Sequence, residues 1–330
     1  MRMHFMRAVV SRHSHGPIGS WKSTDPTFIV PPLVDPAKER PPGAAFFPAL
    51  FVLLWSTGFI AAKYGLPHAP PLTFLLYRFL LVASLMLVVV LATRAPWPRR
   101  LSDYVHVAVA ALLVHGLYLG GVFIALDGGM PAGTSAMLVG LQPILTVFLA
   151  WMWLHERVAP RQWAGLALGL VGVYLVIRHK VDFAGGHNGL LPSAIALIGI
   201  SVGTLYQKRH ANHVDLRSGA VIQFAACALV YAPLAWLFDT RPVQWAPEFL
   251  FALGWSVVVL SVGAISLLYW LLRHGAASNV AGLFFLVPAV TAVMAWLLFG
   301  ETLDSLAIAG LVLISVGVAL ARQMRDPVAP

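Results

Sequence analysis

The chain has 330 residues, of which 59% are hydrophobic and only 11% are charged. A soluble domain carries roughly twice that charged fraction, so this chain cannot cover itself with polar side chains and must use lipid as its solvent. The net charge of +9 does not indicate nucleic-acid binding, because the Lys and Arg residues lie in short loops between apolar runs and form no basic stripe.

Residues 1–44 differ from the rest of the chain because they are basic and rich in proline. We expect them to form a disordered cytoplasmic tail, and we expect residues 323–330 to form a second, short one. The single cysteine, Cys227, lies inside an apolar run, so no disulfide can form within the chain, and a packing role is expected.

Ten apolar segments lie between the tails, each of roughly 17–25 residues and therefore long enough to cross ~30 Å of hydrocarbon as a helix. Breaks containing Gly, Pro or charged residues separate them, and they do not alternate apolar with polar residues as barrel strands do. The sequence therefore predicts an all-α polytopic membrane protein with ten transmembrane helices. The expected spans are 45–64, 72–92, 104–126, 132–154, 161–178, 189–207, 218–238, 248–272, 277–299 and 304–321.

Loop charges predict the orientation of these spans. When the ten segments are threaded through a membrane, most of the 22 Lys and Arg residues fall on one side. Cytoplasmic loops carry the excess of Lys and Arg, so both termini are expected in the cytoplasm.

The second half of the chain repeats the first at a constant shift. Segment 141–156 aligns without a gap with 286–301, and 164–175 aligns with 309–320. Each half, 45–178 and 189–322, then contains five helices. Because five is an odd number, the second half is expected to enter the membrane from the opposite face, as in inverted-repeat carriers.

Two further features recur between the halves. Glu156 and Glu301 occupy matching positions after their spans, which indicates a shared structural role, such as capping the next helix, over the alternative of ion coupling. Glycines in the last span of each half are expected to let helices pack closely. They are Gly165, Gly169, Gly172, Gly310 and Gly317.

The sequence resembles the EamA-type family of the drug/metabolite transporter superfamily. The segment WSTGFIAAKYGLPHAPPLTFLLYRFLL (55–81), and in each half a Pro…Glu stretch followed by a Gly-rich span, carry the resemblance. It implies a permease of the bacterial inner membrane that moves amino acids or related metabolites through a cavity between the halves. It implies no catalytic residue, cofactor or metal.

Arg78 is the first candidate for contact with a solute. It lies within the second span, where an unpaired charge costs at least ~2.5–3.5 kcal/mol at full depth. It is expected either to bind a carboxylate or other anionic group, or to extend to the outer interface with a structural role.

The fourth span offers Ser135, Gln142 and Thr146 at spacings that favour one helical face. Pro143 should bend the helix and free a backbone carbonyl next to Gln142, and Pro288 should bend the matching span. We expect these polar residues to line the cavity, with hydrogen bonding between helices as the alternative.

His115 and Tyr118 share a face of the third span. If protons drive transport, His115 is the candidate relay; the alternative is a packing hydrogen bond. Four more polar residues are expected to complete the cavity lining: Tyr206, Gln223, Ser266 and Tyr269.

The sequence therefore predicts a secondary transporter, monomeric or homodimeric, that moves a zwitterionic or anionic metabolite by alternating access. There is no ATP-binding loop, so we expect the driving energy to come from a gradient or from another protein. A non-transporting receptor or assembly factor stays open as an alternative. A membrane-embedded enzyme is disfavoured because the spans contain no clustered catalytic groups.

Overall fold

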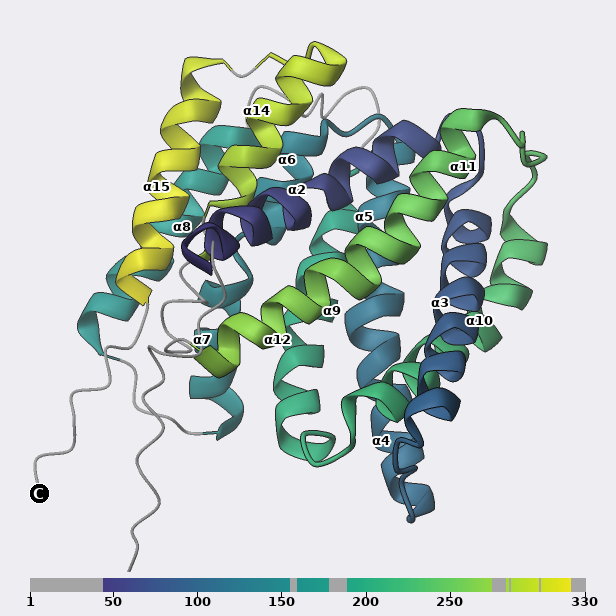
Figure 1. Ribbon diagram of the computed structural model, residues 1–330. Coiled ribbons are helices and arrows are strands. Elements are labelled where there is room, and N and C mark those ends of the chain that lie inside the picture. Colours follow the sequence, from purple (N-terminus) through teal and green to yellow (C-terminus); the bar gives the residue numbers. More distant parts are fainter. Residues whose placement is uncertain are drawn as a thin grey trace, which may run out of the picture. The chain divides into compact units, whose positions relative to one another are not determined.

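A computed structural model of the chain describes residues 44–154, 159–177, 189–274, 283–284, 286–302 and 304–321 (Figure 1). These residues form helices and turns and contain no strand, which confirms the all-α fold. The two tails expected at the ends of the chain lie outside the described residues, apart from Ala44.

The helices of the first half follow the expected spans closely. They are α2 (Phe47–Gly65), α3 (Pro71–Thr93), α4 (Leu101–Ala111), η2 (Leu112–Leu117), α5 (Tyr118–Asp127), α6 (Ala132–Val139), α7 (Gln142–Leu154) and α8 (Pro160–Ile177). A short turn, Ala44–Phe46, leads into α2, and α4, η2 and α5 follow one another without a break.

The second half is built in the same order. Its described helices are α9 (Leu190–His210), α10 (Leu216–Phe238), α11 (Pro247–Gly254), η3 (Trp255–Ala264), α12 (Ile265–His274), α14 (Val287–Phe299) and α15 (Ser305–Ala321). All ten predicted segments overlap a helix. Within the described ranges, seven stretches are long and apolar enough to cross a membrane, and two more apolar helices, α14 and α15, are shorter.

Local chemistry explains where several helices begin and end. Proline occupies the first turn of α3 and α11, where it removes no intrahelical hydrogen bond. Asp215 caps α10 by accepting a hydrogen bond from the Arg217 amide. Gly300 ends α14 in the left-handed conformation (φ 66°), which glycine adopts without steric cost.

Two spans contain a π-helical segment that the sequence did not predict. The segment η2 joins α4 to α5, and η3 joins α11 to α12. They fall at matching positions of the two halves. A π-turn widens the helix and leaves carbonyl groups for other donors, and α10 supplies two of them. The Tyr231 hydroxyl donates to the Gly116 carbonyl over 2.8 Å, and the buried Cys227 thiol donates to the Ala111 carbonyl over 3.4 Å.

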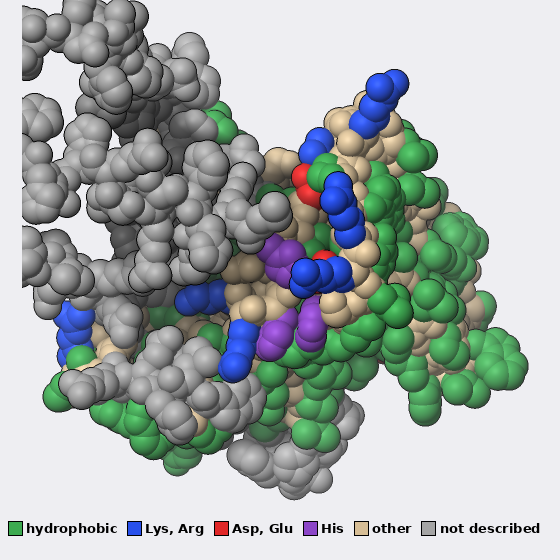
Figure 2. Space-filling model, turned by 90° about the horizontal axis from the view of Figure 1, so that it is seen from below, with side chains coloured by type: hydrophobic (Ala, Val, Ile, Leu, Met, Phe, Trp, Pro, Cys, Tyr) green, Lys and Arg blue, Asp and Glu red, His purple; other side chains and the backbone are tan. Residues whose placement is uncertain are grey.

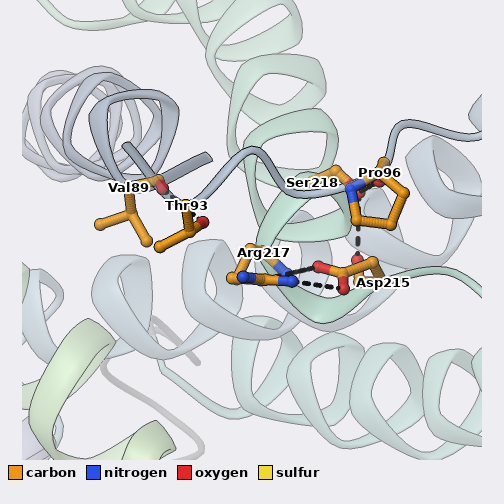
Figure 3. Close-up of polar contacts among 6 residues, drawn as sticks. All are labelled: Val89, Thr93, Pro96, Asp215, Arg217 and Ser218. Atoms are coloured by element: carbon orange, nitrogen blue, oxygen red, sulfur yellow. Dashed lines mark hydrogen bonds and ion pairs between the residues drawn. The ribbon is translucent and has the colours of Figure 1, made fainter. Parts of the chain in front are cut away.

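Equivalent helices of the two halves pack against each other in antiparallel pairs. At one end of the α3–α10 pair, the Thr73 amide and hydroxyl donate to Asp239. At the other end, the Ser218 hydroxyl donates to the Pro96 carbonyl over 2.8 Å (Figure 3). Thr73 and Ser218 are equivalent in the repeat. In each half, therefore, the start of the second helix is hydrogen-bonded to the residues that follow the second helix of the other half.

Helices α8 and α15 form the second antiparallel pair, and glycines make the close contact, as the sequence predicted. A Cβ atom added to Gly172 would lie 2.7 Å from the Gly310 carbonyl oxygen. Seven residues away, one added to Gly317 would lie 2.5 Å from the Gly165 carbonyl oxygen. Only glycine allows backbones to approach this closely.

The interior and the outer surface are both apolar. Five phenylalanines are fully buried where the helices meet: Phe51, Phe74, Phe79, Phe123 and Phe249. Large apolar side chains also face outward, such as Trp236, which is 83% exposed, and Leu229, which is 76% exposed. This distribution is expected for helices that lipid surrounds.

Candidate solute cavity

A cavity of about 590 Å³ lies between the two halves, within the range of 300–1,000 Å³ that is typical of small-molecule sites. The first half contributes residues of α2, α3, η2, α5 and α7, and the second half contributes residues of α9, α10, η3 and α12. Its polar side chains are Arg78, His115, Tyr118, Gln142, Thr146, Thr204 and Ser261.

Arg78 is a buried cation that faces this cavity. Only 8% of it is exposed, so neighbouring helices enclose its side chain. Its Nη2 donates one long hydrogen bond, 3.4 Å, to the Ser261 hydroxyl, and its Nε has no hydrogen-bond partner. None of the ion pairs between described residues includes Arg78, and the described part of the cavity lining contains no Asp or Glu. Among the described residues, a positive charge therefore stands at the cavity without a countercharge.

His115 and Gln223 form a pair between the halves. The His115 Nε2–H lies 3.1 Å from Gln223 Oε1 and donates to it, and the imidazole ring stacks on Phe224 at 4.7 Å. His115 and Tyr118 both line the cavity, on η2 and α5. Gln223 contacts His115 but is not among the lining residues. The pair fixes which ring nitrogen of a neutral His115 carries the proton.

Gln142 joins the halves on another wall. Its Nε2 donates to the Thr204 hydroxyl over 3.2 Å, and Thr204 in turn donates to the Ile200 carbonyl. Thr146, one turn further along α7, lines the cavity with a buried hydroxyl that has no partner in the described structure.

Ser135 does not share the face of Gln142 and Thr146 that the sequence predicted. The helix is interrupted at 140–141, just before Pro143, and Ser135 lies on α6, fully buried and outside the cavity lining. The interruption changes the helical phase, so a spacing counted along one continuous helix fails there. Pro143 and Pro288 both border a smaller void of about 50 Å³ next to this break.

The remaining predicted residues lie elsewhere. The Tyr206 hydroxyl is 2.8 Å from His106 Nδ1, near the end of α9. Ser266 is exposed on α12 and does not line the cavity. Tyr269 belongs to α12, but its side chain lies outside the described part.

The sequence missed Ser261, the hydroxyl that contacts Arg78. Ser261 lies in η3, where helical positions do not follow the 3.6-residue period on which face assignments depend. Its place in the cavity lining could have been found only by knowing that the span is π-helical there.

A cluster around Glu301 joins three segments at one end of the bundle. Glu301 pairs with Lys63 of α2 and accepts hydrogen bonds from the amides of Ala132 (2.9 Å) and Gly133 (3.3 Å) at the start of α6. Lys63 also lies over the Phe299 ring, 5.2 Å from its centroid. We call these residues the Glu301 cluster.

The helix that Glu301 caps differs from the expected one. We expected it to cap the helix that follows it, but it caps α6 of the other half. Asp304 provides the cap for α15, where its Oδ1 accepts from the Ala307 amide over 2.6 Å. Glu156, the equivalent glutamate, lies outside the described residues.

Basic side chains gather at the opposite end of the bundle, as Figure 2 shows with Lys and Arg in blue and His in purple. They come from the α3–α4 loop, the end of α9 and the start of α10: Arg94, Arg99, Arg100, Lys208, Arg209, His210 and Arg217. At the Glu301 end, the two described cations are both paired, Lys63 with Glu301 and Arg241 with Asp127.

Comparisons with known proteins agree with this architecture. An uncharacterised transporter of Bacillus subtilis, YvbV, is 29% identical over 277 residues, which is 82% of this chain and 89% of that protein. A protein of Salmonella typhimurium named as a probable amino-acid metabolite efflux pump is 28% identical over 296 residues, covering 83% and 92%. A solved crystal structure shares the fold, with a TM-score of 0.57 at 21% identity over 84% of this chain and 96% of the other.

The family model of the EamA-like transporters matches both halves separately, at residues 43–178 and 187–323. These matches have nearly the boundaries of the two repeats that the sequence predicted. Both named relatives are transporters, and neither is an enzyme. The chain therefore belongs to the EamA-like transporter family, as a multi-pass membrane protein that handles small molecules.

Proposed function

We propose that this protein is a secondary transporter of the bacterial inner membrane that exports an amino acid or a related zwitterionic or anionic metabolite. The observation that carries the proposal is the cavity between the two halves, with the unpaired Arg78 in its wall. The Salmonella typhimurium relative is named for amino-acid metabolites. Such metabolites carry a carboxylate, which would pair with the Arg78 guanidinium.

The proposed mechanism is alternating access between two inverted halves of five helices each. Two pairs of equivalent helices, α3 with α10 and α8 with α15, run antiparallel, which supports opposite insertion of the halves. The excess of Lys and Arg side chains at one end supports a cytoplasmic location for that end, and with it for both termini. The Glu301 cluster then lies on the outer side, where it would close the cavity.

Energy would come from an ion gradient. Protons are the coupling ion that we propose, with His115 as the group that would carry them, because it is a titratable side chain in the cavity wall that hydrogen-bonds to Gln223 of the other half. The binding residues proposed are those that line the cavity: Arg78, His115, Tyr118, Gln142 and Thr146. Pro143 and Pro288, which border the same small void, would serve as hinges.

Transport can be tested with the purified protein in liposomes preloaded with unlabelled solute. Counterflow of labelled neutral, anionic and cationic metabolites should show uptake of zwitterions or anions, and empty liposomes provide the control. Uptake of cations alone would contradict the proposed substrate class. Saturable binding without any uptake would contradict transport itself and would favour a receptor.

A further inference from the structure

The charge of the cavity points to a narrower class of solute. Building on the proposed transport function, we infer that the cavity selects net-anionic solutes in which one carboxylate is joined to an apolar body of aromatic size. Zwitterions of the same size would bind more weakly, and cations more weakly still. The inference depends on Arg78, on the absence of acidic groups from the lining, and on the apolar walls.

The Ser261 hydroxyl positions the Arg78 guanidinium without neutralising its positive charge. The Ser261 hydroxyl donates its hydrogen to the Ser256 carbonyl over 3.0 Å, so it offers Arg78 only lone pairs. This contact orients the guanidinium and leaves its charge in place. Since Nε is buried without a partner, a carboxylate that reached it would satisfy a donor whose burial is otherwise unfavourable.

The same wall is unfavourable for an ammonium group. In an α-amino acid the ammonium lies next to the carboxylate, so pairing that carboxylate with Arg78 brings two positive charges close together. The described lining has no Asp or Glu to receive the ammonium. An unpaired charge that leaves water for a cavity of low polarity pays a desolvation penalty of several kcal/mol. A solute whose amine is absent or acylated avoids this penalty.

The walls around Arg78 suit an apolar body. They include Trp55, Phe59, Phe224, Leu260, Leu268 and Phe284. Trp55 and Phe284 meet edge to face at 5.2 Å, and Phe224 stacks on His115, so several ring faces and edges border the cavity. A polar body would lose its water against these walls without gaining hydrogen bonds.

Four probes that share a phenyl body separate charge from shape: N-acetyl-L-phenylalanine (anion), L-phenylalanine (zwitterion), N-acetyl-L-phenylalaninamide (neutral) and 2-phenylethylammonium (cation). Their dissociation constants for the full-length protein in detergent can be measured by calorimetry. We expect the anion to bind about tenfold more tightly than the zwitterion and than the neutral amide. Equal or tighter binding of the zwitterion would overturn the inference.

Variants assign the selectivity to Arg78. Arg78→Gln should bind the anion and the neutral amide equally well, whereas Arg78→Lys should keep part of the preference because it keeps the charge. Arg241→Gln, which removes an exposed cation outside the cavity, should behave like the wild type. A preference for the anion that survives in Arg78→Gln would overturn the inference, even if the variant binds more weakly overall.

Failure of this inference differs from failure of the proposed function. If L-phenylalanine exchanges in counterflow and N-acetyl-L-phenylalanine does not bind, the inference is wrong and the transport proposal stands. If none of the four probes binds, the inference is again wrong. Transport is then judged by the wider counterflow series.

Discussion

At the scale of single residues, Tyr231 stabilises a widened helix of the opposite half. It is 5% exposed, and its hydroxyl donates to the Gly116 carbonyl in η2. Tyr231→Phe removes this donor and should lower the free energy of unfolding by on the order of 1 kcal/mol. Thermal unfolding of the purified protein measures the effect, with Tyr174→Phe, at a position that is 64% exposed, as the matched control.

Gly120 tests a second contact of the Tyr231 hydroxyl, its close approach to α5. A Cβ atom at Gly120 would lie 2.1 Å from the Tyr231 hydroxyl oxygen but 3.4 Å from the ring carbon that bears it. Gly120→Ala should therefore destabilise the wild type more than it destabilises the Tyr231→Phe protein. Additive losses in this double-mutant cycle would contradict the contact.

Asp215 gives the stability of the protein a pH dependence at the start of α10. Hydrogen bonds from the Arg217 guanidinium, with Nε at 3.1 Å and Nη2 at 3.0 Å, lower the pKa of the Asp215 carboxyl below its ordinary value (Figure 3). Because the pKa is lower in the folded state, this stabilisation is complete above the unfolded pKa of about 4. It is lost as the pH falls through the folded value.

Asp215→Asn should therefore reduce the unfolding temperature at pH 7, and its effect should shrink as the pH falls through the folded pKa of Asp215. An exposed pair, Asp127 with Arg241, offers the control: Asp127→Asn should have little effect over the same pH range, because exposed ion pairs contribute little. Asparagine can still cap α10, so an Asp215→Asn penalty that does not depend on pH would show that the charge of Asp215 is not its cause.

The sequence could predict which residues are polar and buried in a span, but not which neighbours they meet. Arg78 stood out because a charge in a span is costly, and it lies at the cavity. Ser261 could not be linked to it, because the contact depends on a π-turn and on a residue far along the chain. Ser135 was misplaced by the unrecognised interruption at 140–141.

At the scale of helices, a glycine in the crossing of α8 and α15 and a glycine outside it should respond oppositely to alanine. Gly172→Ala places a methyl group against the Gly310 carbonyl and Ile314, so it should lower the free energy of unfolding by roughly 1–3 kcal/mol. At Gly254 nothing lies within 4 Å of an added Cβ atom, so Gly254→Ala should be neutral or stabilise by about 0.5–1 kcal/mol through helix propensity. Thermal unfolding in detergent measures the change in stability that each substitution causes. Equal effects would contradict the close crossing.

Helix boundaries were well predicted because apolar runs and their Gly, Pro and charged breaks are local signals. The ends of α3, α10 and α15 fall within a few residues of the expected limits. The π-segments η2 and η3 were not predicted, because they arise where the chain fits around the cavity and neighbouring helices. At Pro143 a bend was expected, but not the break at 140–141 just before it. The close packing of α8 on α15 could be predicted from their glycines, because small residues are typical of close helix contacts.

At the scale of the whole molecule, the Glu301 cluster connects the two halves where we propose that the cavity closes to the outside. The Glu301 side chain is 10% exposed and serves three donors, on Lys63 and on the first turn of α6. A carboxylate at a helix N-terminus is favoured by the unpaired amides there, and the Lys63 charge adds to this preference. If the halves rock, α14 must separate from α2 and α6, so these bonds must break in each transport cycle.

Glu301→Gln keeps the size of the side chain and removes its charge, so it should weaken the closed arrangement and favour opening on that side. A cysteine placed at Ala295, which is fully buried on α14, reports the opening in a Cys227→Ala background. Labelling of Ala295→Cys by a membrane-impermeant maleimide should be several-fold faster with Glu301→Gln than without it. Arg241→Gln, which breaks the exposed pair with Asp127, should not change the rate. Equal labelling rates with glutamate and glutamine at position 301 would show that the cluster holds helices together without controlling access.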